Sequence, residues 1–411
     1  MPMVTYAQAL QLILDRVAPL PPRWLPLEEA LGLVAAEAVL AREPVPPFTN
    51  SAMDGFALRA ADGAGASRDT PVRLPVVAEI PAGQPRPAPL QAGTACRIMT
   101  GANVPDGADA VVPVEEASAE DGQVVLCAPP RRGAHIRPVG EDIPAGGVVV
   151  PPGRPLRPAE LGVLAAIGAA VVPVHPRPRV AVLTTGDELV DASQHPGPGQ
   201  IRDANIHSLG AQVRAAGALF TGFPRVPDRR EAVAAALAEA LAGADVVLTN
   251  GGVSVGDFDY IKDVLAGLGA EEVFWRVAQK PGGPLGLWQV QGRLVFGIPG
   301  NPAAAMIMFE EYVRPALRRM MGHRLLHRPE RLARLAAPWR KESRDNRLNF
   351  LRVSLQVRDG QLLAALTGPQ GSGLLASMMR TDALALVLPE TLEIPAGGEV
   401  QVHLLDLPED H

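Results

Sequence analysis

Hydrophobic residues near the start of the chain are spaced as on one face of a helix. They recur at intervals of three and four residues, at Ala9, Leu10, Ile13, Leu14 and Val17. Thr5 precedes them in a position that favours an N-cap. The stretch from Leu27 to Leu40 is rich in Ala, Leu and Glu, which are strong helix formers. The pattern therefore predicts two helices in this region.

The pattern changes between Val45 and Val139, where short apolar runs alternate with Pro, Gly and Asp-Gly turns. The clearest runs are 72–80, 110–114 and 124–128. Runs of this length and spacing are typical of a small β-rich domain. Residues 159–169 look helical again, which predicts that the β-rich region is an insertion within a helical scaffold.

Apolar strands and amphipathic helices alternate between residues 179 and 322. Strands are expected at Val180–Leu183, Ala218–Gly222, Val246–Thr249, Val273–Val277, Leu285–Trp288 and Leu294–Gly297. Helices are expected at Ile206–Ala216, Ala232–Leu241 and Tyr260–Leu268, and from Pro302 onward. Asp228 and Glu231 have the spacing of a capping box before the second of these helices. Such alternation predicts an α/β domain with a largely parallel sheet.

The last part of the chain again has short apolar runs separated by turns, which are typical of β-strands. Residues 351–357 and 361–366 flank Asp359-Gly360, which is a strong hairpin signal. Residues 383–388 and 400–404 add two more strands. A small barrel or sandwich is therefore expected at this end.

Composition narrows the class of protein. A chain of 411 residues is long enough for about two to four domains. Its net charge of −6 does not favour binding to nucleic acid or a membrane surface, so an anionic substrate would need local amides, cations or a metal ion. Two cysteines are too few for a disulfide framework. The N-terminal residues do not resemble a signal peptide, and the longest apolar stretch, 161–174, is too short to span a bilayer. A soluble cytoplasmic protein is expected.

Three polar loops follow strands of the predicted α/β domain, at the sheet edge where ligands bind. They are residues 185–188 (Thr-Gly-Asp-Glu), residues 249–257 (Thr-Asn-Gly-Gly-Val-Ser-Val-Gly-Asp) and residues 297–302 (Gly-Ile-Pro-Gly-Asn-Pro). Each loop alone is also consistent with an ordinary turn or helix start. Glycines allow backbone amides to approach an anion, and the helix that starts after Asn301 would offer free amides to a phosphate. Lys280, in a Pro/Gly turn, would add a cation.

Acidic residues recur in loops outside this domain. Asp54 lies in a polar turn, and Asp142 lies in a Gly/Pro loop. For any one of them alone, a solvated surface carboxylate is the more common case. If such carboxylates converged, their oxygens would suit Mg²⁺. The sequence contains no G-x-S-x-G elbow and no Cys beside a His, so nothing supports a serine or cysteine nucleophile.

Taken together, these loops resemble one family, the molybdopterin molybdenumtransferases, which include the E domain of gephyrin. The resemblance runs over nearly the whole chain in family order. Its segments are 47–55, 97–102, 105–112, 140–143, 185–189, 249–257, 299–302, 350–352 and 371–373.

The resemblance implies an elongated multidomain α/β subunit in four parts. They are a helical scaffold (1–44 and 145–178), an inserted β-rich domain (45–144), a molybdopterin-binding α/β domain with a mostly parallel sheet (179–325) and a C-terminal β barrel (326–411). It also implies a homodimer whose active site lies between one subunit's α/β domain and the other's inserted domain. The implied reaction inserts molybdate into adenylylated molybdopterin, with Mg²⁺, and releases AMP and molybdenum cofactor. Molybdopterin adenylyltransferase and apo-molybdoenzymes are further implied partners.

Matching positions assign site residues. Catalytic roles fall to Asp54, Asp142, Glu188 and Lys280, and metal binding falls to Asp257, Glu188 and Asp54. Substrate contacts are expected from Thr100, Thr185, Asp187, Thr249, Asn250, Gly251, Gly252, Ser254, Pro299, Gly300, Asn301 and Ser372.

Two positions depart from the family pattern. Some members carry a second lysine where this chain has Gly283, and a serine where it has Ala304. One charge and one hydroxyl are thus missing near the expected phosphate site. Two other functions stay open from the residues alone: molybdopterin adenylyltransferase activity, against which the long flanking β domains argue, and a non-catalytic pterin-binding scaffold. Consumption of ATP rather than molybdate, or binding without turnover, would identify these alternatives.

Overall fold

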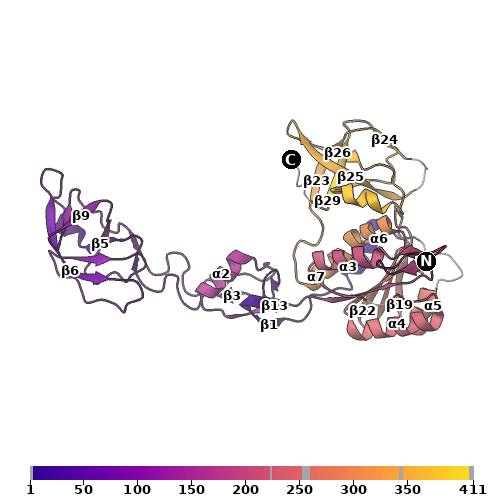
Figure 1. Cartoon of the computed structure of the whole chain (residues 1–411), viewed down its shortest axis with the longest axis horizontal. Helices are drawn as coiled ribbons and strands as arrows, with labels where there is room; N and C mark the ends of the chain where they lie inside the picture. Colours follow the sequence, from indigo (N-terminus) through magenta and orange to yellow (C-terminus); the bar gives the residue numbers. More distant parts are fainter. Residues whose placement is uncertain (1–2, 223–224, 252–259, 342–345, 407–411) are drawn as a thin grey trace. The chain divides into compact units, whose positions relative to one another are not determined.

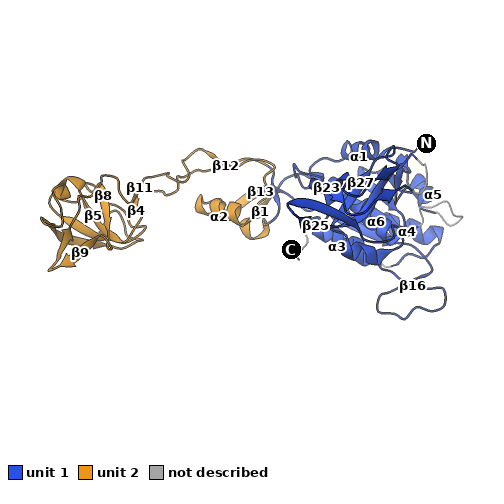
Figure 2. Cartoon of the chain, turned by 90° about the horizontal axis from the view of Figure 1, so that it is seen from above, with its two compact units in different colours: residues 1–23, 32–36, 173–411 blue, residues 24–31, 37–172 orange. Residues whose placement is uncertain are grey.

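The computed structural model describes residues 3–222, 225–251, 260–341 and 346–406. The chain forms two compact units. One contains residues 1–23, 32–36 and 173–411, and the other contains residues 24–31 and 37–172 (Figure 2).

A six-stranded β-sheet forms the centre of the second unit. Its strands are β5 (Gly55–Leu58), β6 (Val72–Ile80), β7 (Ala95–Ile98), β8 (Ala110–Pro113), β9 (Ala117–Glu120) and β10 (Gln123–Leu126). Their order in the sheet is β8-β5-β7-β6-β10-β9. Alternate residues of β5 enter two separate hydrophobic clusters, Phe56 and Leu58 in one and Ala57 in the other. The prediction of a β-rich region with strands at 72–80, 110–114 and 124–128 is confirmed.

The predicted helix from Leu27 to Leu40 is wrong. This stretch forms a 3₁₀ turn, η1 (Leu27–Glu29), and two short strands, β2 (Val34–Ala35) and β3 (Val39–Leu40). Ala35 pairs with Val174 of β13 (Val171–His175), and Leu40 pairs with Val148 of β12 (Val148–Val150). Pairing with strands far along the chain has therefore overridden local helix propensity. The expected scaffold is only modestly helical; its helix α2 spans Pro158–Ala166.

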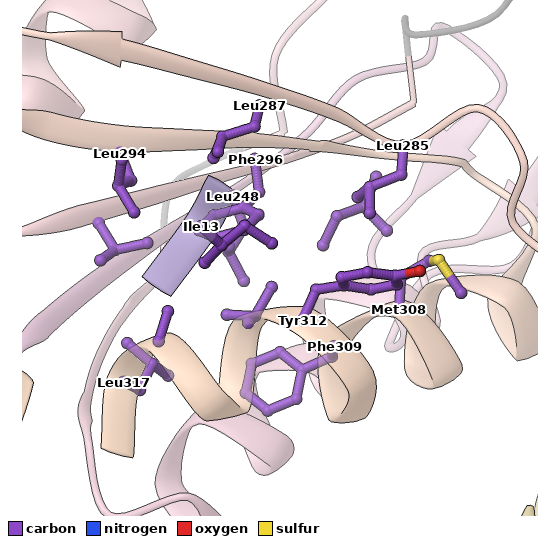
Figure 3. Close-up of a cluster of buried hydrophobic side chains, with 14 of the residues drawn as sticks. Ile13, Leu248, Leu285, Leu287, Leu294, Phe296, Met308, Phe309, Tyr312 and Leu317 are labelled. Atoms are coloured by element: carbon purple, nitrogen blue, oxygen red, sulfur yellow. The ribbon is translucent and has the colours of Figure 1, made fainter. Parts of the chain in front are cut away.

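The first unit begins with the predicted N-terminal helix, α1 (Tyr6–Leu14). Thr5 is its N-cap, and Thr5 and Gln8 bond each other's backbone amides in a capping box. Ile13 is fully buried in the largest hydrophobic cluster (Figure 3). The apolar face seen in the sequence is thus the face that packs.

The central sheet of the first unit is mixed. Its strands are β14 (Arg179–Thr184), β17 (Leu219–Gly222), β18 (Val246–Asn250), β19 (Glu271–Trp275), β21 (Gly286–Val290) and β22 (Arg293–Ile298). The order is β17-β14-β18-β22-β21-β19. The first four strands in this order are parallel to one another, β21 is antiparallel to β22, and β19 is antiparallel to β21.

Helices cover both faces of this sheet (Figure 1). The cluster that contains Val180 and Val182 of β14 includes residues of α3 (Asn205–Ala215), α6 (Pro302–Met308) and α7 (Arg314–Met320). The cluster that contains Ala181 and Leu183 includes residues of α4 (Arg230–Gly243) and α5 (Tyr260–Gly267). Such two-sided burial explains why these strands read as continuous apolar runs.

The predicted capping box of Asp228 and Glu231 is wrong. Helix α4 begins at Arg230, so Arg229 is the N-cap residue, and no side chain caps this helix start. Asp228 therefore does not cap this helix, and it lies instead beside Asp187.

The C-terminal region is a closed five-stranded barrel. Strands β23 (Glu330–Leu335), β25 (Leu348–Arg358), β26 (Gln361–Leu366), β27 (Ala383–Val387) and β29 (Glu399–Leu404) follow in the order β25-β26-β23-β29-β27, and β27 pairs with β25. The predicted hairpin is present, with Asp359 and Gly360 at φ of 52° and 73°. The short strand β20 (Gln279–Lys280) pairs with β25, although the chain reaches it from the α/β domain. No helix among the described residues has the length and apolar character needed to cross a membrane.

Candidate active site

A large cavity lies in the first unit, beside the carboxyl ends of β14, β18 and β22. Its volume is about 1310 Å³. Residues of the barrel line it as well as residues of the α/β domain. The predicted site residues among its lining are Thr185, Glu188, Asn250, Gly251, Lys280, Pro299, Gly300, Asn301 and Ser372. The structure thus brings together loops that are scattered along the sequence.

The cavity lies where the order of the parallel strands reverses. From β14 the chain adds β17 on one side and β18 on the other, which is the place where open α/β sheets bind ligands. The loop after β14 is joined there to the end of β18 by a bond of 3.1 Å from Thr185 N to Asn250 O. Gly251 follows with φ of +90°, and a Cβ at this position would lie 2.7 Å from Thr185 O. Glycine is required at 251 because the two backbones approach so closely.

The carboxylate of Glu188 folds back over Gly186. A Cβ at position 186, where φ is +152°, would lie 2.5 Å from Glu188 Oε2 and 2.8 Å from Cδ. The missing side chain therefore makes room for the acidic group that lines the cavity. This geometry gives the Thr-Gly-Asp-Glu loop a reason for its glycine.

Asn205, which is not among the residues predicted from the sequence, connects two of the cavity loops. Its Nδ2 donates to Asn250 Oδ1 and to Gly300 O, each at 2.7 Å. Asn250 Nδ2 in turn donates to Pro299 O at 2.8 Å. Asn205 Oδ1 is buried and has no hydrogen-bond partner within the described parts of the chain. Its position directly after Asp203-Ala204, at the start of α3, was the available signal.

Three carboxylates gather beside the cavity loop after β14. Asp228 N donates to Asp187 Oδ1 at 3.3 Å. Burial raises the pKa of Asp228, and the negative charges of Asp187 and Glu188 raise it further. The sequence spacing of Asp228 predicts a helix cap and gives no sign of its proximity to Asp187 and Glu188. In the described residues, no group of three or more His, Cys, Asp or Glu side chains is placed to hold a metal ion.

The start of α6 differs from the expectation of free amides. Asn301 is the N-cap residue and Pro302 opens the helix, as predicted, but the Asn301 side chain makes no capping bond. The amides of Ala303 and Ala304 donate to the carbonyl oxygen of Ser372, at 3.1 and 3.3 Å. A barrel loop therefore occupies the donors that were expected to bind a phosphate.

Arg352 holds that barrel loop in place. Its side chain is 1% exposed, and its guanidinium donates to Gly371 O and Pro369 O, each at 3.0 Å. The segment 368–373 lines the cavity. The Phe-Leu-Arg and Gly-Ser-Gly motifs thus act together, because one fixes the backbone of the other.

Among the described residues, basic side chains outnumber acidic ones around the cavity. The charged residues of this described lining are Arg202, Lys280, Arg340, Lys341 and Arg347 against Glu188 and Asp203. The cavity therefore favours an anionic ligand although the whole chain carries a charge of −6. Gly283 and Ala304, the two departures from the family pattern, also line it.

The remaining predicted residues lie elsewhere. Thr249 is fully buried, and its hydroxyl donates to Phe296 O at 3.4 Å rather than lining the cavity. Asp187 is exposed beside Asp228. Gly252, Ser254 and Asp257 lie outside the described residues.

Asp54 and Thr100 contact each other in the second unit. Asp54 Oδ1 accepts bonds from the hydroxyl and the backbone amide of Thr100, both at 2.7 Å. These bonds hold the pKa of the Asp54 carboxyl below its usual value. Asp142, in the same unit, is exposed, and its amide donates to Val45 O at 3.0 Å. Two predicted residues 46 positions apart in the sequence thus form one local polar group.

Comparison with known families covers most of the chain. Residues 4–168 match the MoeA N-terminal region (domain I and II). Residues 181–319 match the probable molybdopterin binding domain, and residues 333–405 match the MoeA C-terminal region (domain IV).

Individual relatives agree with this assignment. Molybdopterin molybdenumtransferase 2 of Mycobacterium tuberculosis is 39% identical over 93% of this chain and 94% of its own length. Molybdopterin molybdenumtransferase of Bacillus subtilis is 36% identical over 93% and 89%. A crystal structure of the molybdopterin biosynthesis MoeA protein of Pyrococcus horikoshii covers 98% of this chain and 100% of its own, with 28% identity and a TM-score of 0.81. The chain therefore belongs to the family of molybdopterin molybdenumtransferases.

Proposed function

We propose that this protein is a transferase of molybdenum cofactor biosynthesis that inserts molybdate into adenylylated molybdopterin and releases AMP. The observation that carries the proposal is the cation-rich cavity at the switch point of the sheet. It gathers Glu188, Asn250, Gly251, Lys280 and Ser372 around one space. A volume of about 1310 Å³ is large for a small-molecule site and suits a ligand that joins a nucleotide to a pterin.

The described residues have distinct roles in this proposal. Lys280 balances negative charge on the phosphates, and the glycine at 251 lets the backbone approach them closely. Asn205 and Asn250 hold the loops after β18 and β22 at a constant separation. Fixed polar groups of this kind need no reorganisation when charge develops at the phosphate that is cleaved.

Mg²⁺ fits the residues only with help from the substrate. Asp187 and Glu188 are close enough to Asp228 to raise the pKa of its carboxyl, yet the three carboxylates form no complete metal site. Mg²⁺ commonly takes one or two carboxylates, several waters and substrate phosphate oxygens. We propose that Glu188 and its acidic neighbours hold the ion, together with Asp257, and that the bound ion neutralises charge on the phosphates.

We also propose that the protein is a homodimer, with Asp54, Thr100 and Asp142 of one subunit completing the site of its partner. Family membership supports this arrangement, and so does the polar group that Asp54 forms with Thr100. The bonds from Thr100 lower the pKa of Asp54 and so favour its ionised form, which a carboxylate that binds a metal ion needs.

The reaction is tested by measuring AMP release from adenylylated molybdopterin with and without molybdate. Asp54→Asn and Glu188→Gln should each fold normally, and the rate of AMP release should fall by at least about a hundredfold in each. Consumption of ATP in place of molybdate would show an adenylyltransferase instead. Tight binding of the substrate by the wild type without turnover would show a scaffold.

Mixing the two inactive variants tests the shared site. In a statistical mixture, half of the dimers pair one Asp54→Asn subunit with one Glu188→Gln subunit. Each such dimer has one intact site if the site is shared between subunits, so about a quarter of wild-type activity should return. A site contained within one subunit would give no recovery.

A further inference from the structure

A buried glutamine, Gln279, precedes Lys280 in β20 and also lines the cavity. Gln279 is fully buried, and its Nε2 donates to Pro281 O at 3.0 Å and lies 2.8 Å from Met308 Sδ. Its Oε1 accepts a hydrogen bond from the hydroxyl of Tyr312. We propose that Tyr312 and Gln279 are positioning residues that set Lys280 for binding an anionic substrate. This inference rests on the proposed function.

The hydrogen bonds of Gln279 determine which way its amide faces. The carbonyl of Pro281 can only accept, so the amide must present Nε2 to it. Oε1 then faces Tyr312, whose hydroxyl can donate. A phenylalanine at 312 would leave that buried oxygen without its donor, which is a costly state that the amide can relieve only by moving. Movement of the amide would release Pro281 O, one residue after Lys280.

Backbone bonds hold the two ends of the turn. Leu348 N donates to Ala278 O at 3.0 Å, and Val277 N donates to Gly283 O at 2.9 Å. Strand β20 also pairs with β25, with Lys280 opposite Asn349. The Gln279 side chain adds support from inside the turn, between these two anchors. It therefore acts on the residues that face the cavity more than on the strand itself.

Tyr312 is itself held firmly. It lies in the π-helix η3 (Phe309–Val313) and is fully buried beside Met308 and Phe309 (Figure 3). The ring of Tyr6 contacts it edge-on, with 5.5 Å between centroids. Tyr6 donates its own hydroxyl to Glu311 Oε2 at 2.8 Å and not to the Lys280 turn. Two neighbouring tyrosines thus differ in whether they reach the turn, which provides a matched control.

The experiment compares Tyr312→Phe, Gln279→Met and the control Tyr6→Phe in the full chain. The Michaelis constant for adenylylated molybdopterin and the affinities for AMP and for molybdate are measured separately. We expect each of the first two variants to raise the KM, or the dissociation constant of one anion, by about five- to tenfold. This is the usual effect of losing one buried hydrogen bond. Their kcat should change by less than about twofold. Tyr6→Phe should lower thermal stability to a similar extent and leave these constants unchanged.

Lys280→Ala tests whether the pair acts through the lysine. In that background, Tyr312→Phe should weaken anion binding by less than about twofold more, because its target is gone. An undiminished effect there, or equal effects of Tyr312→Phe and Tyr6→Phe, would overturn the proposal. Gln279→Met keeps the test decisive if Tyr312→Phe fails to fold. A wild type without molybdate-dependent AMP release would refute the proposed reaction instead, and the binding comparison would still judge the positioning.

Discussion

The contact between Gly186 and the carboxylate of Glu188 leads to a specific prediction for Gly186→Ala. The added Cβ would lie 2.5 Å from Glu188 Oε2, so the carboxylate must leave its place at the cavity. The alanine would also have to adopt φ of +152°, which L-residues rarely do. The variant should therefore lose both stability and activity.

The two causes differ in size and can be separated. An unfavourable backbone conformation costs about 1–3 kcal/mol. The three nearest atoms to the new methyl all belong to Glu188, which can turn to another rotamer at a cost of about 1 kcal/mol. Gly186→Ala should thus lower the free energy of unfolding by about 2–4 kcal/mol. In a Glu188→Ala background, only the backbone part should remain.

Urea unfolding of the wild type, both single variants and the double variant measures this coupling. AMP release measures the second effect, which should approach that of Glu188→Gln because the carboxylate is displaced in one variant and neutralised in the other. Equal destabilisation in both backgrounds would refute the steric argument. Normal turnover by Gly186→Ala would show that the observed place of Glu188 is not needed.

Two other predictions follow from contacts in each unit. Asn205→Ala removes the bonds to Asn250 and Gly300 and should lower the free energy of unfolding by about 1–3 kcal/mol and weaken AMP binding, as calorimetry would show; unchanged AMP affinity would contradict the bridging role. In the second unit, ion pairs with Arg157 and Arg154 lower the pKa of Glu160 to about 2. Its contribution should be complete above the ordinary pKa of 4.5 and should be lost as the pH falls through the folded pKa of about 2. Glu160→Gln should therefore be less stable than the wild type by about 1 kcal/mol at pH 7, and most of this difference should be gone near pH 2. Denaturant unfolding at both pH values measures the difference, and an equal difference at both would contradict the prediction.

Local pattern predicted the parts of the fold where burial is periodic or continuous. The apolar runs of β14, β18 and β22 identified their strands because helices cover both faces of the sheet. The Asp359-Gly360 turn identified the hairpin because both residues take positive φ. The stretch from Leu27 to Leu40 could not be assigned in this way, since its strands depend on partners more than a hundred residues away.

The candidate site shows the same division. Loops that follow predicted strands were placed at one sheet edge, and the cavity contains residues of all three. Asp228 was missed because its sequence spacing fits a helix cap equally well, and only its approach to Asp187 reveals otherwise. The contact of the Ser372 carbonyl with the start of α6 could not be predicted, because a residue of any type can supply a backbone carbonyl to a distant helix.

The pairing of β20 with β25 has a consequence for truncated forms of the protein. A chain that ends after the α/β domain would leave the Gln279–Lys280 strand without its neighbour and the amides of Ala303 and Ala304 without their acceptor. A separately expressed barrel would likewise lack the strand that extends it. Shortened genes that separate these parts should therefore yield material prone to association through open β edges, and fusion partners belong at the chain ends rather than at this junction.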